Sequence, residues 1–341
     1  MRSLPAIVFV AASLLSVPPA TAAESVNLYS ARQEALIAPL LERFTERTGI
    51  EVNLVTGSAD ALIKRLEVEG RNTPADMLIT VDAGRLHRAK SAGLFRATES
   101  ERLAARVPAH LRDDDHQWFG LSQRARVIAY STERVDPSEL STYEALADEQ
   151  WNDRICVRSS DNIYNQSLLA SIVAAKGEQA ATAWARGVVE NMARRPQGGD
   201  RDQIMAVAAG VCDVAIVNTY YYGRMRSEQA QPDQRAAAQK VALFFPNQGG
   251  RGTHVNVSGA GVTEHARNPD NAVRLLEFLV SDAAQRWYAK VNYEYPVVPG
   301  VDVSAAVREW GYPFERDDLP LSRLGELNAT AVRIFDRVGW R

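Results

Sequence analysis

Short apolar runs alternate with amphipathic stretches along the first part of the chain. Residues 26–29 and 50–54 have the apolar or alternating pattern of β-strands. Between them, residues 37–44 place apolar side chains at i, i+3, i+4 and i+7, which predicts a helix that ends at Gly49. The same alternation continues with a helix at 61–69, a strand at 75–80 and a helix at 83–92. Strand–helix alternation of this kind predicts an α/β fold whose parallel sheet is covered on both faces.

The rest of the chain predicts a second lobe. Two short predicted strands, 118–121 and 127–130, flank a polar stretch that we interpret as the first crossing between lobes. A glycine-rich turn at 247–253 precedes a return to the first lobe. Further strands are predicted at 154–157, 211–217 and 241–245, and further helices at 138–147, 203–209, 268–280, 283–288 and 319–338.

The chain is therefore predicted to fold into two α/β lobes, each a mixed, mainly parallel sheet flanked by helices. Residues 24–123 plus 247–300 form the predicted first lobe, and residues 124–246 plus 301–341 form the second. A cleft between such lobes is a natural ligand site, and hinge closure around a ligand is a common motion.

Residues 1–23 have the pattern of a secretory signal peptide. Arg2 precedes an apolar run at 4–17, and small residues suitable for cleavage follow up to Ala23. A membrane anchor is the alternative, but the apolar run is short for one, and no other long apolar segment follows. We therefore expect an exported protein that is not integral to the membrane.

Composition narrows the range of functions. The sequence is 46% hydrophobic and 24% charged with a net charge of −3, which argues against a nucleic-acid partner because such a partner requires a basic face. The sequence has no Gly-x-Ser-x-Gly and no His-Glu-x-x-His motif, so we do not expect an enzyme.

Two cysteines, Cys156 and Cys212, each fall in a predicted strand. Export permits a disulfide between them if those strands are neighbours, and the sequence leaves this open.

Three consecutive tyrosines are the most unusual feature of the chain. The buried-strand pattern at 214–217 ends in Asn218-Thr219, and Tyr220, Tyr221 and Tyr222 follow. No single face of a helix or strand can bury all three phenols, and ligands of open α/β sheets bind beyond the carboxyl ends of strands. A hard, highly charged cation can displace the phenolic proton and bind the oxygen. This pattern predicts a site for a trivalent metal such as Fe³⁺, and aromatic packing at a strand end is the alternative.

Two other polar strand ends could face the same cleft. Tyr164, in the polar stretch 160–165, would supply a third phenol beside Tyr220 and Tyr221. Three phenolates neutralise a 3+ ion and leave coordination positions for a small anion such as carbonate. Arg32 and Gln33 suit that anion, because a guanidinium matches a planar oxyanion and an amide can donate to it. The helix expected after residue 159 would also direct free N–H groups toward an anion.

With these segments together, the chain resembles the periplasmic ferric-ion-binding proteins of ABC iron importers, bacterial relatives of transferrin in chemistry. The resemblance spans the mature chain and depends on residues 26–34, 122–130, 158–167 and 218–221. It implies a type II periplasmic binding protein that delivers iron to an inner-membrane permease without chemical turnover. In this family the tyrosine pair after Asn-Thr and the tyrosine before Asn-Gln-Ser bind iron, which implies Tyr220, Tyr221 and Tyr164 here.

The chain departs from many family members at Arg32 and Gln33, where those members have histidine, tyrosine or both. It is therefore similar to the branch that uses three tyrosines and a carbonate-like anion. Of Arg124 and Arg126, we expect only Arg124 to face the cleft, with the two side chains on opposite sides. The predicted anion-binding residues are Arg32, Gln33, Arg124, Ser160 and Asn162, and the predicted supporting residues are Asn218 and Tyr222.

Other functions remain open at this stage. The cleft could hold an organic anion, a phosphonate or a carboxylate, between Arg32 and Arg124. The same cleft would also serve a sensor that docks on a membrane receptor. We expect the protein to be a monomer.

Overall fold

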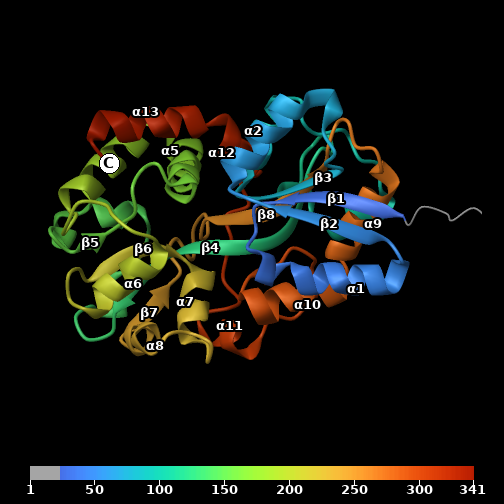
Figure 1. Cartoon of the computed structure of the whole chain (residues 1–341). Helices are drawn as coiled ribbons and strands as arrows, with labels where there is room; N and C mark the ends of the chain where they lie inside the picture. The colour runs from blue at the N-terminus through green and yellow to red at the C-terminus, as the bar shows by residue number, and fades with distance from the viewer. Residues whose placement is uncertain (1–23) are drawn as a thin grey trace, which may run out of the picture.

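The computed structural model describes residues 24–341 and contains a curled, mixed β-sheet that runs through both halves of the molecule (Figure 1). The strands are β1 (Ser25–Ser30), β2 (Glu51–Thr56), β3 (Met77–Val81), β4 (Phe119–Ser131), β5 (Ile155–Cys156), β6 (Val214–Asn218), β7 (Val241–Phe244), β8 (Val255–Val262) and β9 (Tyr295–Pro296). Their order is β2-β1-β3-β8-β4-β6-β5, and β7 and β9 also pair with β4.

Helices cover both sides of this sheet. Figure 1 shows α2 on one side of β1 and β2, with α1 and α10 on the other. In the second half, α13 packs along α5. The α-helices are α1 (Ala38–Thr48), α2 (Ala59–Glu69), α3 (Ala83–Ser91), α4 (Glu101–Arg106), α5 (Ile163–Glu190), α6 (Asp200–Ala208), α7 (Thr219–Arg226), α8 (Pro232–Gln239), α9 (Pro269–Leu279), α10 (Asp282–Trp287), α11 (Ala305–Glu309), α12 (Ser322–Glu326) and α13 (Asn328–Val338).

The strand–helix alternation predicted for residues 26–92 is confirmed. Helix α1 buries Leu40, Leu41 and Phe44, as its periodicity predicts. Gly49 ends the helix in the left-handed region, with φ of 75°, where a residue without a Cβ is favoured. Strands β1, β2 and β3 are parallel neighbours, and β3 is buried along most of its length.

The prediction of two short strands around residue 124 is wrong, because β4 is one continuous strand of 13 residues. Its first part pairs with β8 and its last part with β6 and β7, so the crossing between the halves occurs within the strand. The polar side chains in its middle are buried and find partners on other segments. Gln123, for example, donates from Nε2 to the carbonyl oxygen of Pro296 at 2.7 Å. Local sequence cannot reveal such distant partners.

The sheet is also less parallel than predicted. The α/β class is confirmed, but only the β1–β2, β1–β3 and β5–β6 pairs among the described strands are parallel. The strands β4 and β8, which run between the halves, pair antiparallel with their neighbours. The lobe boundaries given above stay a prediction.

The prediction of a helix at 138–147 is wrong as well. Only two short 3₁₀ turns form there, Pro137–Glu139 and Glu144–Ala147. The backbone at Leu140 is extended, and the N–H of Tyr143 donates to Asn247 Oδ1 at 3.0 Å instead of to a helical carbonyl. A tertiary contact therefore replaces the helix.

The two cysteines form a disulfide. Cys156 ends β5, Cys212 lies just before β6, and their Cα atoms are 5.8 Å apart.

The predicted signal peptide, residues 1–23, lies outside the described residues. Between residues 24 and 341, no helix combines the length and apolar character needed to cross a membrane.

Candidate functional site

A cavity of about 360 Å³ lies where the two halves of the sheet meet. It is lined by the segment after β1, by β4, by Glu294, and by the first turns of α5, α6 and α7. The lining residues are Ala31, Arg32, Gln33, Leu36, Val81, Arg124, Tyr164, Gly199, Asp200, Arg201, Asp202, Tyr220, Tyr221, Arg224 and Glu294. The three tyrosines predicted as metal ligands therefore share one cavity with Arg32, Gln33 and Arg124.

The phenols converge from two helices. The hydroxyl of Tyr220 donates to the hydroxyl of Tyr164 at 3.3 Å, across 56 positions of sequence. The rings of Tyr220 and Tyr221 lie with their centroids 4.2 Å apart. Their oxygen atoms are hard donors of the kind that trivalent cations prefer once the phenolic protons are lost.

Tyr222 points elsewhere. Its hydroxyl donates to the carbonyl oxygen of Val241 at 3.0 Å, and its ring packs edge-on against Trp310. It is buried but is not among the residues that line the cavity. The first turn of α7 thus directs two phenols into the cavity and one into the core, because successive helical residues point about 100° apart.

The tyrosines begin helices rather than lying in loops. Asn162 caps α5, and its Oδ1 accepts from the N–H of Tyr164 at 3.2 Å. Asn218 precedes α7, and its own N–H donates to Asp200 Oδ2 at 2.7 Å. Ser160 accepts from Gln166 through its carbonyl oxygen. Ser160, Asn162 and Asn218 do not line the cavity, so the described contacts of the two asparagines hold backbone in place.

Opposite the phenols, two arginines are paired with a buried carboxylate that the sequence analysis missed. Arg32 Nη2 lies 2.7 Å from Glu294 Oε2, and Arg124 Nη2 lies 3.1 Å from Oε1. Burial opposes ionisation of Glu294, but the two guanidinium groups outweigh it and lower the pKa of the carboxyl from its ordinary 4.5 to about 2. Glu294 belongs to no motif and lies far along the chain, so only the fold could reveal it.

Arg124 nevertheless keeps free donor capacity. It is 2% exposed, and its Nη2 is shared between Glu294 and Ser258. Within residues 24–341, its Nη1 and Nε have no hydrogen-bond partner. A buried, unsatisfied guanidinium N–H beside a cavity is suited to an anion.

The prediction that Arg126 points away from Arg124 is wrong. Residues two apart in a strand share a face, and each guanidinium group lies near one of the two tyrosines whose hydroxyls meet, Tyr164 and Tyr220. The Cζ of Arg124 lies 5.9 Å from the ring centroid of Tyr220, and the Cζ of Arg126 lies 5.9 Å from that of Tyr164. Only Arg124 lines the cavity, as predicted.

Arg126 and Asp200 connect the two helices that begin with the tyrosines. Arg126 donates to Asn165 Oδ1 at 2.6 Å and to Asn218 Oδ1 at 3.1 Å, beside the two ligand segments. It also pairs with Asp200 at 3.2 Å, and Arg158 pairs with the other oxygen of that carboxylate. Both residues were missed as supports, since nothing local in the sequence places them together.

The environment opposes ionisation of Tyr220 and Tyr221 in the absence of a cation. Burial raises the pKa of Tyr220 well above its ordinary value, and the neighbouring phenols Tyr164 and Tyr221 add to the effect. Burial, together with Tyr164 and the Asp200 carboxylate, raises the pKa of Tyr221 to about 12. A bound cation would reverse this preference, because its charge would favour the phenolate form of each tyrosine.

The chain is similar to known proteins. Residues 72–314 match the family model described as bacterial extracellular solute-binding protein. The chain is 50% identical over 318 residues to iron uptake protein A1 of Synechocystis sp., covering 93% of this chain and 88% of that protein. It is 29% identical over 296 residues to the major ferric iron-binding protein of Neisseria meningitidis, covering 85% and 86%.

Two solved structures are also similar. One is the Trichodesmium protein FutA (IdiA) in complex with iron and citrate ligands, with a TM-score of 0.90 and 48% identity. It covers 93% of this chain and all of that one. The other is the ferric binding protein of Campylobacter jejuni, with a TM-score of 0.88, 41% identity and coverage of 93% and 100%.

Proposed function

The chain belongs to the bacterial extracellular solute-binding protein family, and from this premise we propose that it captures Fe³⁺ in the periplasm with the phenolate oxygens of Tyr164, Tyr220 and Tyr221. The observation that supports this most is the 3.3 Å contact between the hydroxyls of Tyr164 and Tyr220 in a cavity that Tyr221 also lines. Similar proteins named for iron uptake and ferric iron binding support the choice of metal.

Three phenolates balance the charge of Fe³⁺ but do not fill its coordination sphere. We therefore include a synergistic anion, carbonate or bicarbonate, held by the free Nη1 of Arg124 and by Gln33. Arg32 contributes charge next to the anion, although its Nη2 is already paired with Glu294. Ser160 and Asn162, first proposed as direct anion ligands, act in this proposal by shaping the start of α5. The similar Trichodesmium structure contains citrate with iron, so a carboxylate is the competing anion.

The protein acts by binding and release, without chemical turnover. It delivers its ion to the permease of an ABC importer in the inner membrane and works as a monomer. Family membership supports the transport role. The proposed export signal is residues 1–23.

The test is optical. Adding Fe³⁺ with bicarbonate to the protein should produce a visible phenolate-to-iron charge-transfer band. Tyr220→Phe and Tyr221→Phe should each remove or shift this band and lower iron affinity by more than about 100-fold, because loss of a supporting partner alone usually costs about 10- to 100-fold. Tyr222→Phe is the matched control, because its hydroxyl donates to the carbonyl oxygen of Val241. Metal analysis of protein purified without added chelator should also find iron.

The outcome that would overturn the proposal is equally specific. If Fe³⁺ produces no band in the wild-type protein, while a phosphonate or carboxylate alone raises its melting temperature, the cavity binds an organic anion through Arg32 and Arg124. A band that survives both Tyr220→Phe and Tyr221→Phe would place the metal elsewhere.

A further inference from the structure

The disulfide joins the two segments that lead to the converging tyrosines. Cys156 stands eight positions before Tyr164, and Cys212 stands eight positions before Tyr220. Both segments run out of parallel neighbours, β5 and β6, toward the cavity. We propose that Cys156 and Cys212 are positioning residues for iron binding, because their bond fixes the offset between these segments so that the two hydroxyls meet. The proposal rests on the function proposed above.

Strand β5 needs such support because its own pairing is minimal. It pairs with β6 through two ladder positions, Ile155 with Val214 and Cys156 with Ala215, and on its other edge Ile155 forms an isolated bridge with Met192. Sliding by one residue would displace the following chain by about 3.3 Å and turn its side chains to the other face. Metal–ligand distances tolerate only about 0.2 Å of error. Two ladder positions and one isolated bridge are a weak basis for that tolerance, and a covalent bond removes the freedom to slide.

A second connection lies nearer the tyrosines. Asp200 accepts from Arg158 at 3.2 Å, two positions after Cys156, and from the N–H of Asn218 at 2.7 Å, two positions before Tyr220. The two segments are thus joined at two levels, by the disulfide at the strands and by the Asp200 carboxylate beside the cavity. Just before the two strands, Arg154 also pairs with Asp213 at 2.7 Å, so the disulfide is one of several contacts that resist pivoting.

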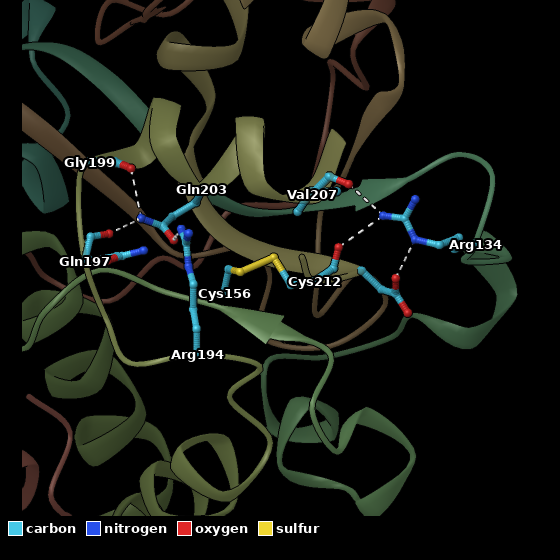
Figure 2. Close-up of a disulfide and its surroundings, with 9 residues drawn as sticks. Arg134, Cys156, Arg194, Gln197, Gly199, Gln203, Val207 and Cys212 are labelled. Atoms are coloured by element: carbon cyan, nitrogen blue, oxygen red, sulfur yellow. Dashed lines mark hydrogen bonds and ion pairs between the residues drawn. A yellow bond between two sulfur atoms is a disulfide. The ribbon is translucent and has the colours of Figure 1, made fainter. Parts of the chain in front are cut away.

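Helix α6 links these two levels. Asp200 begins the helix at the cavity, and Val207 lies near its other end. Figure 2 shows Arg134 donating to the carbonyl oxygens of Val207 and Cys212, at 2.6 Å and 3.1 Å. The disulfide lies beside this helix in the same view, and Cys156 and Cys212 are 0% and 3% exposed. Such burial shields the sulfur atoms from exchange with external thiols, so the bond acts through geometry.

The experiment removes the bond and measures the iron site. In Cys156→Ala with Cys212→Ala, iron affinity should fall by about 10-fold or more, the usual scale for losing a group that orients metal ligands. The charge-transfer band should shift, because the phenolate oxygens no longer sit at their fixed separation. A second pair, Cys156→Val with Cys212→Ala, refills the sulfur volume and keeps the test valid if the first pair folds poorly.

The matched control separates positioning from general stability. Leu276, on α9 in the other half, is fully buried, so Leu276→Ala should also lower the melting temperature. It should leave the band and the iron affinity unchanged. If a folded cysteine-free pair keeps the wild-type band and affinity, the disulfide only stabilises the fold and the proposal is wrong.

A measurement without iron distinguishes the two proposals. In protein labelled with ¹³C-tyrosine, the ring signals of Tyr164 and Tyr220 should move when the disulfide is removed and stay in place in Leu276→Ala. If wild-type protein binds no Fe³⁺ but these signals move, the proposed function fails, while the disulfide still positions Tyr164 and Tyr220 for whatever the cavity binds. If the signals do not move, the positioning role fails whatever the protein binds.

Discussion

On one side of the cavity three phenols face one another, whereas on the other side two arginines are already paired with a buried glutamate. The hydroxyls of Tyr164 and Tyr220 form a hydrogen bond with each other, and burial raises the pKa of Tyr220. Glu294, by contrast, is ionised by its arginine partners and accepts from Ser122 as well. The tyrosine side thus lacks a cation to balance its phenolates, whereas the arginine side already contains its carboxylate and, within residues 24–341, keeps unpaired N–H groups on Arg124. Cargo affinity should depend on the first side and fold stability on the second.

The largest expected effect belongs to the tyrosine side alone, and it is the pH dependence of iron binding. Each phenol must lose its proton to bind Fe³⁺, and burial raises the pKa of Tyr221 to about 12, so protons compete strongly below that value. Release of three protons would weaken affinity by up to about 1,000-fold for each unit that the pH falls.

Competition titrations against a chelator of known affinity, at several pH values around neutrality, measure this slope. The chelator's own protonation must be included in the analysis. Release of a single proton per iron would contradict three phenolate ligands.

On the arginine side, Glu294→Ala should chiefly reduce stability. It leaves the guanidinium groups of Arg32 and Arg124 buried without their carboxylate, which typically costs about 3–5 kcal/mol. Urea unfolding measures the loss, and the charge-transfer band should persist. Glu326→Ala is the control, because its exposed pair with Arg323 contributes about 1 kcal/mol or less.

The same variant has a pH signature. The lowered pKa of Glu294 adds stability above the ordinary carboxyl value of 4.5, and this contribution is lost as the pH falls through about 2. The stability gap between wild type and Glu294→Ala should therefore shrink in strong acid. A gap that is constant with pH would show that Glu294 is not ionised in the folded protein.

The smallest effect is expected from Tyr222→Phe, which tests where the tyrosine side ends. The change removes the hydrogen bond to the Val241 carbonyl and the one accepted from Arg226 Nη1, and should cost about 1–2 kcal/mol of stability. Iron affinity should not change. A loss of affinity comparable to that of Tyr220→Phe would extend the site to the third phenol.

Much of this arrangement could be predicted from the sequence. The family resemblance is confirmed by the relatives, the α/β class is confirmed by the fold, and residues 26–92 follow their hydrophobic periodicity. Six of the predicted site residues line the cavity. They are Arg32, Gln33, Arg124, Tyr164, Tyr220 and Tyr221, and each lies in a segment on which the family resemblance depends. Their roles as metal and anion ligands stay predictions.

The misses share a physical cause. Glu294, Arg126 and Asp200 are charged residues that the fold buries by bringing distant partners to them, and no local pattern encodes such a contact. The continuity of β4 was missed for the same reason, since its polar centre looks like a loop until its partners are known. The phenols were found because three adjacent tyrosines are unusual within the sequence itself.

Strand β4 also determines how the molecule can flex. It pairs with β8 up to Ala125 and with β6 from Arg126 onward, so rotation of one half against the other must bend this single strand. Neighbours on both edges hinder sliding, which leaves bending and twisting as the available deformations. The point of greatest curvature would lie at the two arginines that flank the phenols. The angle between the halves would then depend on whether the cavity is occupied. A membrane receptor that contacts both halves would sense this angle without touching the cavity.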